Sequence, residues 1–172
     1  MEEYTIKHLI DTFRTIDRIE HSDMPMIFSL SCTVSSPVAW NKRKLENELN
    51  ITIPLDLEKL WNEASSLRLF EDTTYGQWGL IIWSPDQIVE QQKLQAAQKR
   101  EQDFRRGDLI IGRFLGDLEL PILRCDPASN DFGRVIIALE IYHRSEWYTA
   151  AESLTVFLRK FLEARGEKFW ER

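Results

Sequence analysis

Residues 108–139 contain the sequence feature that most constrains the fold. Three apolar runs, Leu109–Phe114, Leu118–Cys125 and Val135–Leu139, are separated by short segments of turn-forming residues. Apolar runs of strand length separated by turns are typical of neighbouring antiparallel strands, so this block predicts an antiparallel meander. Pro121 lies inside the middle run and has no backbone N–H to donate to a sheet, which predicts a bulge or an edge position there.

Helical and strand patterns flank the meander on both sides. Apolar, partly alternating sequences predict further strands at residues 26–34, 67–70 and 78–83. Ser84 with Gln87, and Thr149 with Glu152, have the spacing of a capping box at the start of a helix. Together with apolar stripes, these signals predict helices at about residues 6–16, 41–49, 54–64, 84–103 and 149–162. Strands between helices predict one α+β domain over residues 1–172, with a central, mostly antiparallel sheet and flanking helices.

The charge balance excludes one class of partner. The formal net charge is −6, and the acidity is concentrated in residues 1–36 and 52–92, which carry −3 and −5. Proteins that follow nucleic-acid phosphates gather Lys and Arg on one face, so we expect no direct nucleic-acid binding. The longest apolar run, Trp78–Trp83, is far too short for a membrane span, and the acidic start does not resemble a secretory signal. We therefore expect a cytoplasmic protein.

Side chains that carry catalysis or bind metals are scattered along the chain. His8, His21 and His143 have no Cys, His or carboxylate partner at the spacing of a metal site. Cys32 and Cys125 lie in apolar, strand-like runs and are interpreted as buried, reduced thiols. A disulfide, or a nucleophilic pair of Cys125 with His143, is the alternative. No phosphate-binding glycine pattern occurs, so we expect no catalysis and no cofactor.

Acidic and aromatic side chains near the middle of the chain form the best candidate binding site. Residues 71–78 mix both kinds on a predicted loop within the most acidic part of the chain, and a second acidic pair lies at residues 117–119. Tyr and Trp offer a large contact area at low entropic cost, and clustered acids attract a basic partner. A solvated loop is the alternative, and for the tryptophan a place in the core. The candidate residues are Glu71, Asp72, Tyr75, Trp78, Asp117 and Glu119.

Several short motifs occur in an order that resembles a known superfamily. The first part reads Leu45-Glu46-Asn47-Glu48-Leu49, then Ile53-Pro54-Leu55-Asp56-Leu57 and Leu60-Trp61. Ile82-Trp83-Ser84-Pro85 and Leu109-Ile110-Ile111-Gly112 follow. This order is similar to that of the SUKH superfamily over residues 40–165, and residues 1–36 precede it as an added helix and strand. One departure is Ala64-Ser65-Ser66, which stands where the family usually has Asn-Gly, so this turn has to form without glycine.

The SUKH superfamily includes the Smi/Knr cell-wall regulators of fungi and many bacterial toxin-immunity proteins. The resemblance implies a SUKH-like α+β fold, no catalysis, and function through binding another protein. Bacterial members typically neutralise polymorphic or contact-dependent toxins, nuclease domains among them. An acidic protein suits that role, because nuclease clefts are basic. We expect an immunity-type domain whose partner is a cognate toxin domain; the alternatives are a regulatory or scaffold domain of the fungal type and a small-ligand-binding domain.

Overall fold

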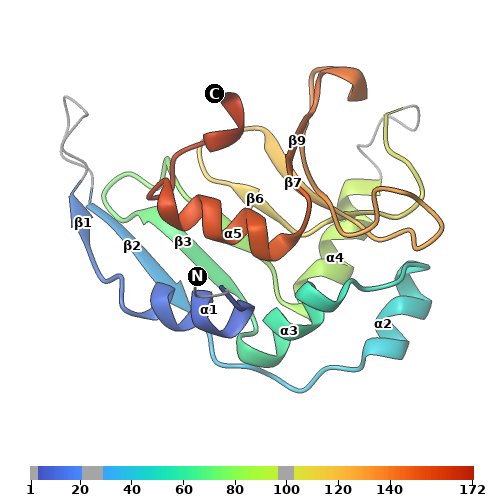
Figure 1. Ribbon diagram of the computed structural model, residues 1–172, viewed down its shortest axis with the longest axis horizontal. Helices are drawn as coiled ribbons and strands as arrows, with labels where there is room; N and C mark the ends of the chain where they lie inside the picture. Colours follow the sequence, from blue (N-terminus) through green and yellow to red (C-terminus); the bar gives the residue numbers. More distant parts are fainter. Residues whose placement is uncertain (1–3, 21–28, 97–102) are drawn as a thin grey trace.

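The computed structural model describes residues 4–20, 29–96 and 103–172. This part of the chain contains five α-helices and two antiparallel β-sheets, which confirms the predicted α+β class (Figure 1). Buried apolar side chains from Ile6 near one end to Trp170 near the other form one hydrophobic cluster. Among the described residues, no helix has the length and apolar character needed to cross a bilayer.

All strand pairings among the residues that the structure describes are antiparallel. The first sheet has the order β1-β2-β3-β4-β6, formed by Ile19–Glu20, Ser29–Val34, Leu67–Asp72, Leu80–Ile82 and Gly112–Phe114. The second has the order β5-β7-β8-β9, formed by Asp108–Ile110, Glu119–Arg124, Val135–Leu139 and Tyr148–Ala151. The strand predicted at residues 26–34 is present from Ser29, and residues 26–28 lie outside the described part.

The predicted run Leu109–Phe114 is divided between the two sheets at Ile111. The Ile111 N–H donates to the Pro121 carbonyl (3.0 Å) in the second sheet, while the Ile111 carbonyl accepts from the Trp83 N–H (2.9 Å) in the first. Gly112 follows, and a Cβ there would lie 1.8 Å from the Ile81 carbonyl oxygen, so this crossing requires glycine. The prediction of one meander is therefore wrong for this run, because its second half, β6, pairs with β4.

Pro121 occupies the place in β7 where the neighbouring strand crosses over. Its pairing with Ile137 of β8 is in regular register, so the predicted bulge is absent. In an antiparallel strand, the N–H and C=O of one residue point to the same side. A donor at residue 121 would therefore face Ile111, whose carbonyl already accepts from Trp83. The missing N–H costs no pairing, which explains how a central strand accommodates proline.

Three helices, α1 (Ile6–Arg14), α3 (Leu55–Glu63) and α5 (Leu154–Glu163), cover one face of the first sheet (Figure 1). The other two, α2 (Lys42–Leu49) and α4 (Pro85–Ala96), contact each other at its side, and α4 also contacts β5. Edge-to-face ring contacts join α1, β3 and α5 through fully buried side chains. These side chains are Phe13, Phe70 and Phe161.

One of the two predicted capping boxes is confirmed and the other is wrong. The Ser84 hydroxyl accepts from the Gln87 N–H (3.3 Å) and the Gln87 side chain accepts from the Ser84 N–H (3.0 Å), a complete capping box. At the other site, Thr149 belongs to β9 and pairs with Ile136 of β8. Helix α5 starts later, capped by Ser153, because strand pairing overrides the local signal. The predicted extension of α4 over residues 97–102 lies outside the described residues.

Candidate functional site

The loop after β3 is organised by a buried carboxylate. Asp72 is only 1% exposed, and its Oδ1 accepts from the N–H groups of Thr74 (2.9 Å) and Tyr75 (3.1 Å). The Asp72 N–H donates to the Trp78 carbonyl (2.9 Å), which closes the loop. Tyr75 lies at the tip with 55% of its surface exposed. Asp72 therefore shapes the loop from within, and Tyr75 is the side chain the loop presents.

The predicted acid Glu71 has a partner on its own strand. Its two carboxylate oxygens accept from the Arg68 guanidinium at 2.6 and 2.7 Å. This hydrogen-bonded pair holds the pKa of the Glu71 carboxyl below its usual value. Phe70, just before it, has a left-handed backbone (φ 50°) and lies in a β3 bulge opposite β2. Glu71 thus offers a partly neutralised charge at the edge of the loop.

Trp78 is fixed between the loop and the C-terminal segment. It is half-buried against the core, and its Nε1–H donates to the Gly166 carbonyl (3.0 Å). The Lys168 ammonium lies 6.0 Å from the centroid of its ring, at the outer limit of a cation–π contact. Trp78 was predicted to lie either in a binding loop or in the core. Its ring packs on the core and also borders the surface, so each prediction is met in part.

Lys168 also holds the second pair of predicted acids. Its Nζ contacts Asp117 Oδ2 and lies 3.2 Å from Glu119 Oε2. Burial raises the pKa of Glu119, and the Lys168 charge only partly offsets this effect. For Asp117, burial acts in the same direction, but the Lys168 hydrogen bond and the loop amides lower its pKa overall. Glu119 is thus an internal partner of Lys168, and Asp117 is the more exposed acid of the two.

The structure brings the two predicted segments together. A Cβ at Gly116 would lie 2.2 Å from the Gln77 carbonyl oxygen, so the turn between β6 and β7 packs directly on the loop after β3. An open groove of about 500 Å³ lies beside this contact. We call it the β6–β7 groove; its lining includes Gly76, Gln91, Gln95, Arg113, Asp117, Leu118, Leu120 and Glu140.

A model of the SMI1 / KNR4 family (SUKH-1) matches residues 42–160 of this chain. The chain belongs to this family. The predicted SUKH resemblance is thereby confirmed. No curated protein matches the sequence.

Motif residues of this SUKH-1 chain are mostly parts of its core. Leu45, Leu57 and Trp61 are buried, and the Trp61 Nε1–H donates to the Trp83 carbonyl (3.0 Å), which ties two motifs together. At the departure from the family pattern, Ala64 has an extended backbone (φ −153°), so no glycine is needed there. The Ser65 N–H bonds to the Ser35 carbonyl (3.2 Å), so the segment that follows β2 supports this turn.

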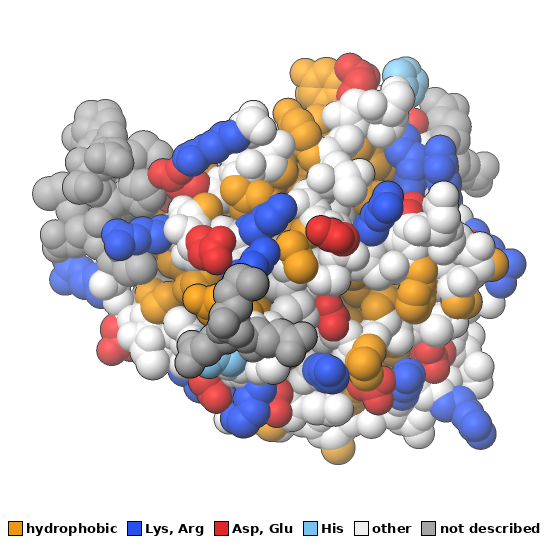
Figure 2. All heavy atoms as spheres, viewed as in Figure 1, with side chains coloured by type: hydrophobic (Ala, Val, Ile, Leu, Met, Phe, Trp, Pro, Cys, Tyr) orange, Lys and Arg blue, Asp and Glu red, His pale blue; other side chains and the backbone are white. Residues whose placement is uncertain are grey.

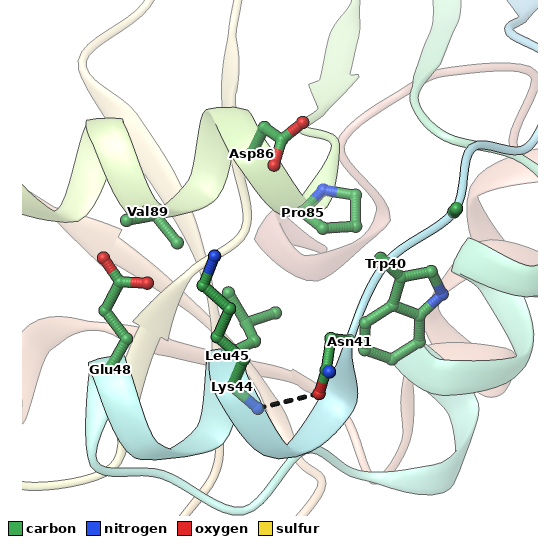
Figure 3. A pocket seen from close by; sticks show the side chains of 9 residues that line it. Trp40, Asn41, Lys44, Leu45, Glu48, Pro85, Asp86 and Val89 are labelled. Atoms are coloured by element: carbon green, nitrogen blue, oxygen red, sulfur yellow. Dashed lines mark hydrogen bonds between the residues drawn. The ribbon is translucent and has the colours of Figure 1, made fainter.

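A second open groove lies between α2 and α4 of this SUKH-1 fold. It has a volume of about 580 Å³, with Lys44 and Glu48 on one side and Asp86 on the other (Figure 3). Leu45 and Pro85 contribute apolar surface between them (Figure 3). The charges are of both signs and the groove is open, so it has no feature that selects a particular ligand.

The side chains considered for catalysis differ in their surroundings. Both cysteines are free and buried, as predicted. Burial raises the pKa of the Cys32 thiol to about 11 and that of Cys125 further still. The His143 side chain is exposed, 3.5 Å from Asp103, and His21 lies outside the described residues. In the described part of the chain, no three His, Cys, Asp or Glu side chains form a group that could hold a metal ion.

Sequence reasoning missed two exposed apolar residues near the groove. Leu118 is 62% exposed and Ile141 is 69% exposed, at the ends of two apolar runs. Leu118 was included in the predicted strand run Leu118–Cys125, because a strand-like run gives no signal of where its burial stops, and Ile141 lies two residues beyond the run Val135–Leu139. The role of the six predicted residues in partner binding stays a prediction, with Tyr75 and Asp117 the best placed of them for direct contact.

Proposed function

We propose that this SUKH-1 protein is a non-catalytic immunity protein of the cytoplasm that neutralises a toxin domain by direct binding. The observation that carries the proposal is the meeting of the two acidic and aromatic segments beside the β6–β7 groove. Fixed aromatic side chains next to acids favour contact with a basic protein surface. The net charge of −6 favours attraction of such a partner over longer distances.

The construction of this surface supports binding without closure of a lid. Asp72 fixes the loop that presents Tyr75, and Lys168 fixes the turn that presents Asp117. Side chains held in place before binding lose little entropy on association. A preformed surface is typical of tight inhibitory complexes, in which the interface backbone moves little.

Coexpression with the toxin domain of the neighbouring reading frame tests this proposal. Growth should be restored by the wild-type chain, and the two purified proteins should form a complex. Changing Tyr75→Ala together with Glu140→Lys should weaken the complex, whereas Asp86→Lys, an exposed control in the α2–α4 groove, should not. A wild-type chain that neither protects nor binds would refute the immunity role. Loss of binding in the control alone would move the site to the α2–α4 groove.

A further inference from the structure

The segment after α5 contacts both parts of the candidate binding surface. Residues 166–172 leave α5 and pass beside the loop after β3 and the turn between β6 and β7 (Figure 1). We call residues 166–172 the strap and residues 115–118 the β6–β7 turn. On the face of the molecule seen in Figure 2, acidic, basic and hydrophobic side chains lie close together. The strap is therefore placed to hold the loop and the turn in one arrangement.

Apolar packing fixes the strap near both of its ends. Gly166 has a left-handed backbone (φ 83°), and a Cβ there would lie 2.5 Å from the Cβ of Phe70, so the strap begins pressed against β3. Trp170 is 8% exposed, and its ring centroid lies 5.2 Å from that of Phe114 in β6 and 5.8 Å from that of Phe157 in α5. Such ring contacts stabilise the packing of the strap on the core. Between these two anchors the strap passes the loop and the turn.

Three links join the strap, the loop and the turn in a closed ring. The Trp78 Nε1–H of the loop donates to the first carbonyl of the strap (3.0 Å). The Leu115 N–H of the turn donates to the Gly79 carbonyl of the loop (2.8 Å). The third link runs from Lys168 of the strap to Asp117 of the turn. All three segments line a cavity of about 70 Å³, which leaves space for them to shift when a link is broken.

The third link depends on a single positive charge. Lys168 Nζ contacts Asp117 and also lies 3.2 Å from Glu119 Oε2 and 3.9 Å from Glu171 Oε1. The Lys168 and Glu119 side chains are only 14% and 9% exposed. Burial raises the pKa of Glu119, and the neighbouring acids Asp117 and Glu171 act in the same direction. Without the ammonium, the carboxylates of Asp117 and Glu119 would repel each other with little water between them.

We propose that Lys168 is an ionic latch, whose ammonium holds the strap, the loop and the β6–β7 turn together so that they keep or lose their shape as one unit. This proposal rests on the binding role proposed above and adds a control on that surface. With the latch closed, Tyr75 and Asp117 are presented in a fixed arrangement; with the latch open, both become mobile and binding costs more entropy. By linkage, a partner that binds the closed arrangement also tightens the strap. Lys168 is thus a positioning residue and needs no contact with the partner.

Amide hydrogen exchange of the full chain, followed by NMR, tests the latch without a partner. In Lys168→Met at neutral pH, exchange should rise by roughly tenfold or more at the Leu115 N–H of the turn and at the Asp72 N–H that closes the loop. The matched control is Lys42→Met, which breaks an ion pair with Glu58 (2.8 Å) on the surface and should leave both amides as in the wild type. Unchanged exchange in Lys168→Met, or an equal rise throughout the chain, would overturn the proposal.

Two further variants separate the charge of the latch from its packing. Adding Glu119→Gln to the Lys168→Met chain removes the repulsion, so exchange in the turn should return toward the wild-type rate. Exchange that stays fast in the double variant would show that lost packing, and not charge, opens the ring. If Lys168→Met does not fold, Asp117→Asn tests the same link more mildly, because Lys168 keeps its contact with Glu119. Exchange should then rise in the turn and not in the strap, and wild-type exchange in the turn would overturn the proposal.

The toxin assay separates failure of the latch from failure of the immunity role. If the wild-type chain protects cells and Lys168→Met protects equally well despite faster exchange, the immunity role stands and the latch does not control the surface. If the wild-type chain neither binds nor neutralises the toxin, the immunity role fails, and the exchange rates alone decide whether the latch couples the three segments.

Discussion

Replacing Asp108 with alanine should destabilise the protein strongly, because this carboxylate lies between the buried guanidinium group of Arg124 and the largely buried one of Arg144. Its side chain is 1% exposed, and it accepts from Arg124 (2.8 Å), Arg144 and the Arg105 N–H (2.7 Å). The Arg124 side chain is 4% exposed. Removing the carboxylate leaves two cations close together with little water to solvate them.

Removing one partner of a buried ion pair costs about 3–5 kcal/mol. Asp131 remains as a second partner of Arg124 (3.0 Å), which places the expected loss for Asp108→Ala near the lower end, about 3 kcal/mol. Asp11 provides a matched control, since it also bridges two cations, Lys7 (3.1 Å) and Arg14 (2.7 Å), but on the surface. For Asp11→Ala we expect a loss below about 1 kcal/mol.

Urea unfolding followed by tryptophan fluorescence measures both losses by linear extrapolation. Asp108→Ala should also lower the melting temperature by roughly 6–12 °C, at about 2–4 °C for each kcal/mol. Equal losses for Asp108→Ala and Asp11→Ala would refute the argument that burial makes this cluster costly to break. A loss below about 1 kcal/mol for Asp108→Ala would show that the two arginines reach water in the variant.

Three further expectations concern pH, backbone and thiols. The pKa values of Asp131 and Glu71 are lowered, so these carboxylates stabilise the fold above their unfolded pKa near 4 and lose this effect as the pH falls. In a plot of melting temperature against pH, Asp131→Asn should therefore reduce the decline at acid pH. Gly112→Ala should lower the free energy of unfolding more than Gly133→Ala, because an added Cβ meets the Ile81 carbonyl at Gly112 and open space at Gly133, even though Gly133 has a positive φ. A smaller shift of the urea midpoint for Gly112→Ala than for Gly133→Ala would contradict this. Both cysteines should resist a thiol reagent until the chain unfolds, and rapid labelling of the native protein would show that burial does not protect them.

Local signals in the sequence were reliable where the structure depends on local bonds. The capping box of Ser84 and Gln87 formed as predicted, since both of its bonds lie within four residues. The same pattern at Thr149 failed, because β8 supplies a pairing partner that local spacing cannot reveal. The division of Leu109–Phe114 at Ile111 was likewise invisible, since it depends on a carbonyl that accepts from Trp83 in another sheet.

Sequence reasoning singled out the two segments of the candidate site, whose role in binding stays a prediction. Acidic and aromatic residues at 71–78 and 117–119 were singled out, and the structure places these two segments in contact. Their individual tasks could not be predicted, because the burial of Asp72 and the partner of Glu119 depend on distant parts of the chain. Lys168, which holds the turn, lies 51 residues from Asp117 in sequence.

The acidity of residues 52–92 illustrates how a charge count differs from a binding surface. Most of these acids have internal tasks: Asp56 accepts from Thr155 at the start of α5, Glu58 pairs with Lys42, Glu63 with Lys7 and Glu71 with Arg68, and Asp72 bonds to loop amides. Such acids contribute to the long-range field, but reversing their charge would disturb the fold as well as any complex. Tests of binding therefore belong at exposed positions such as Tyr75 and Glu140.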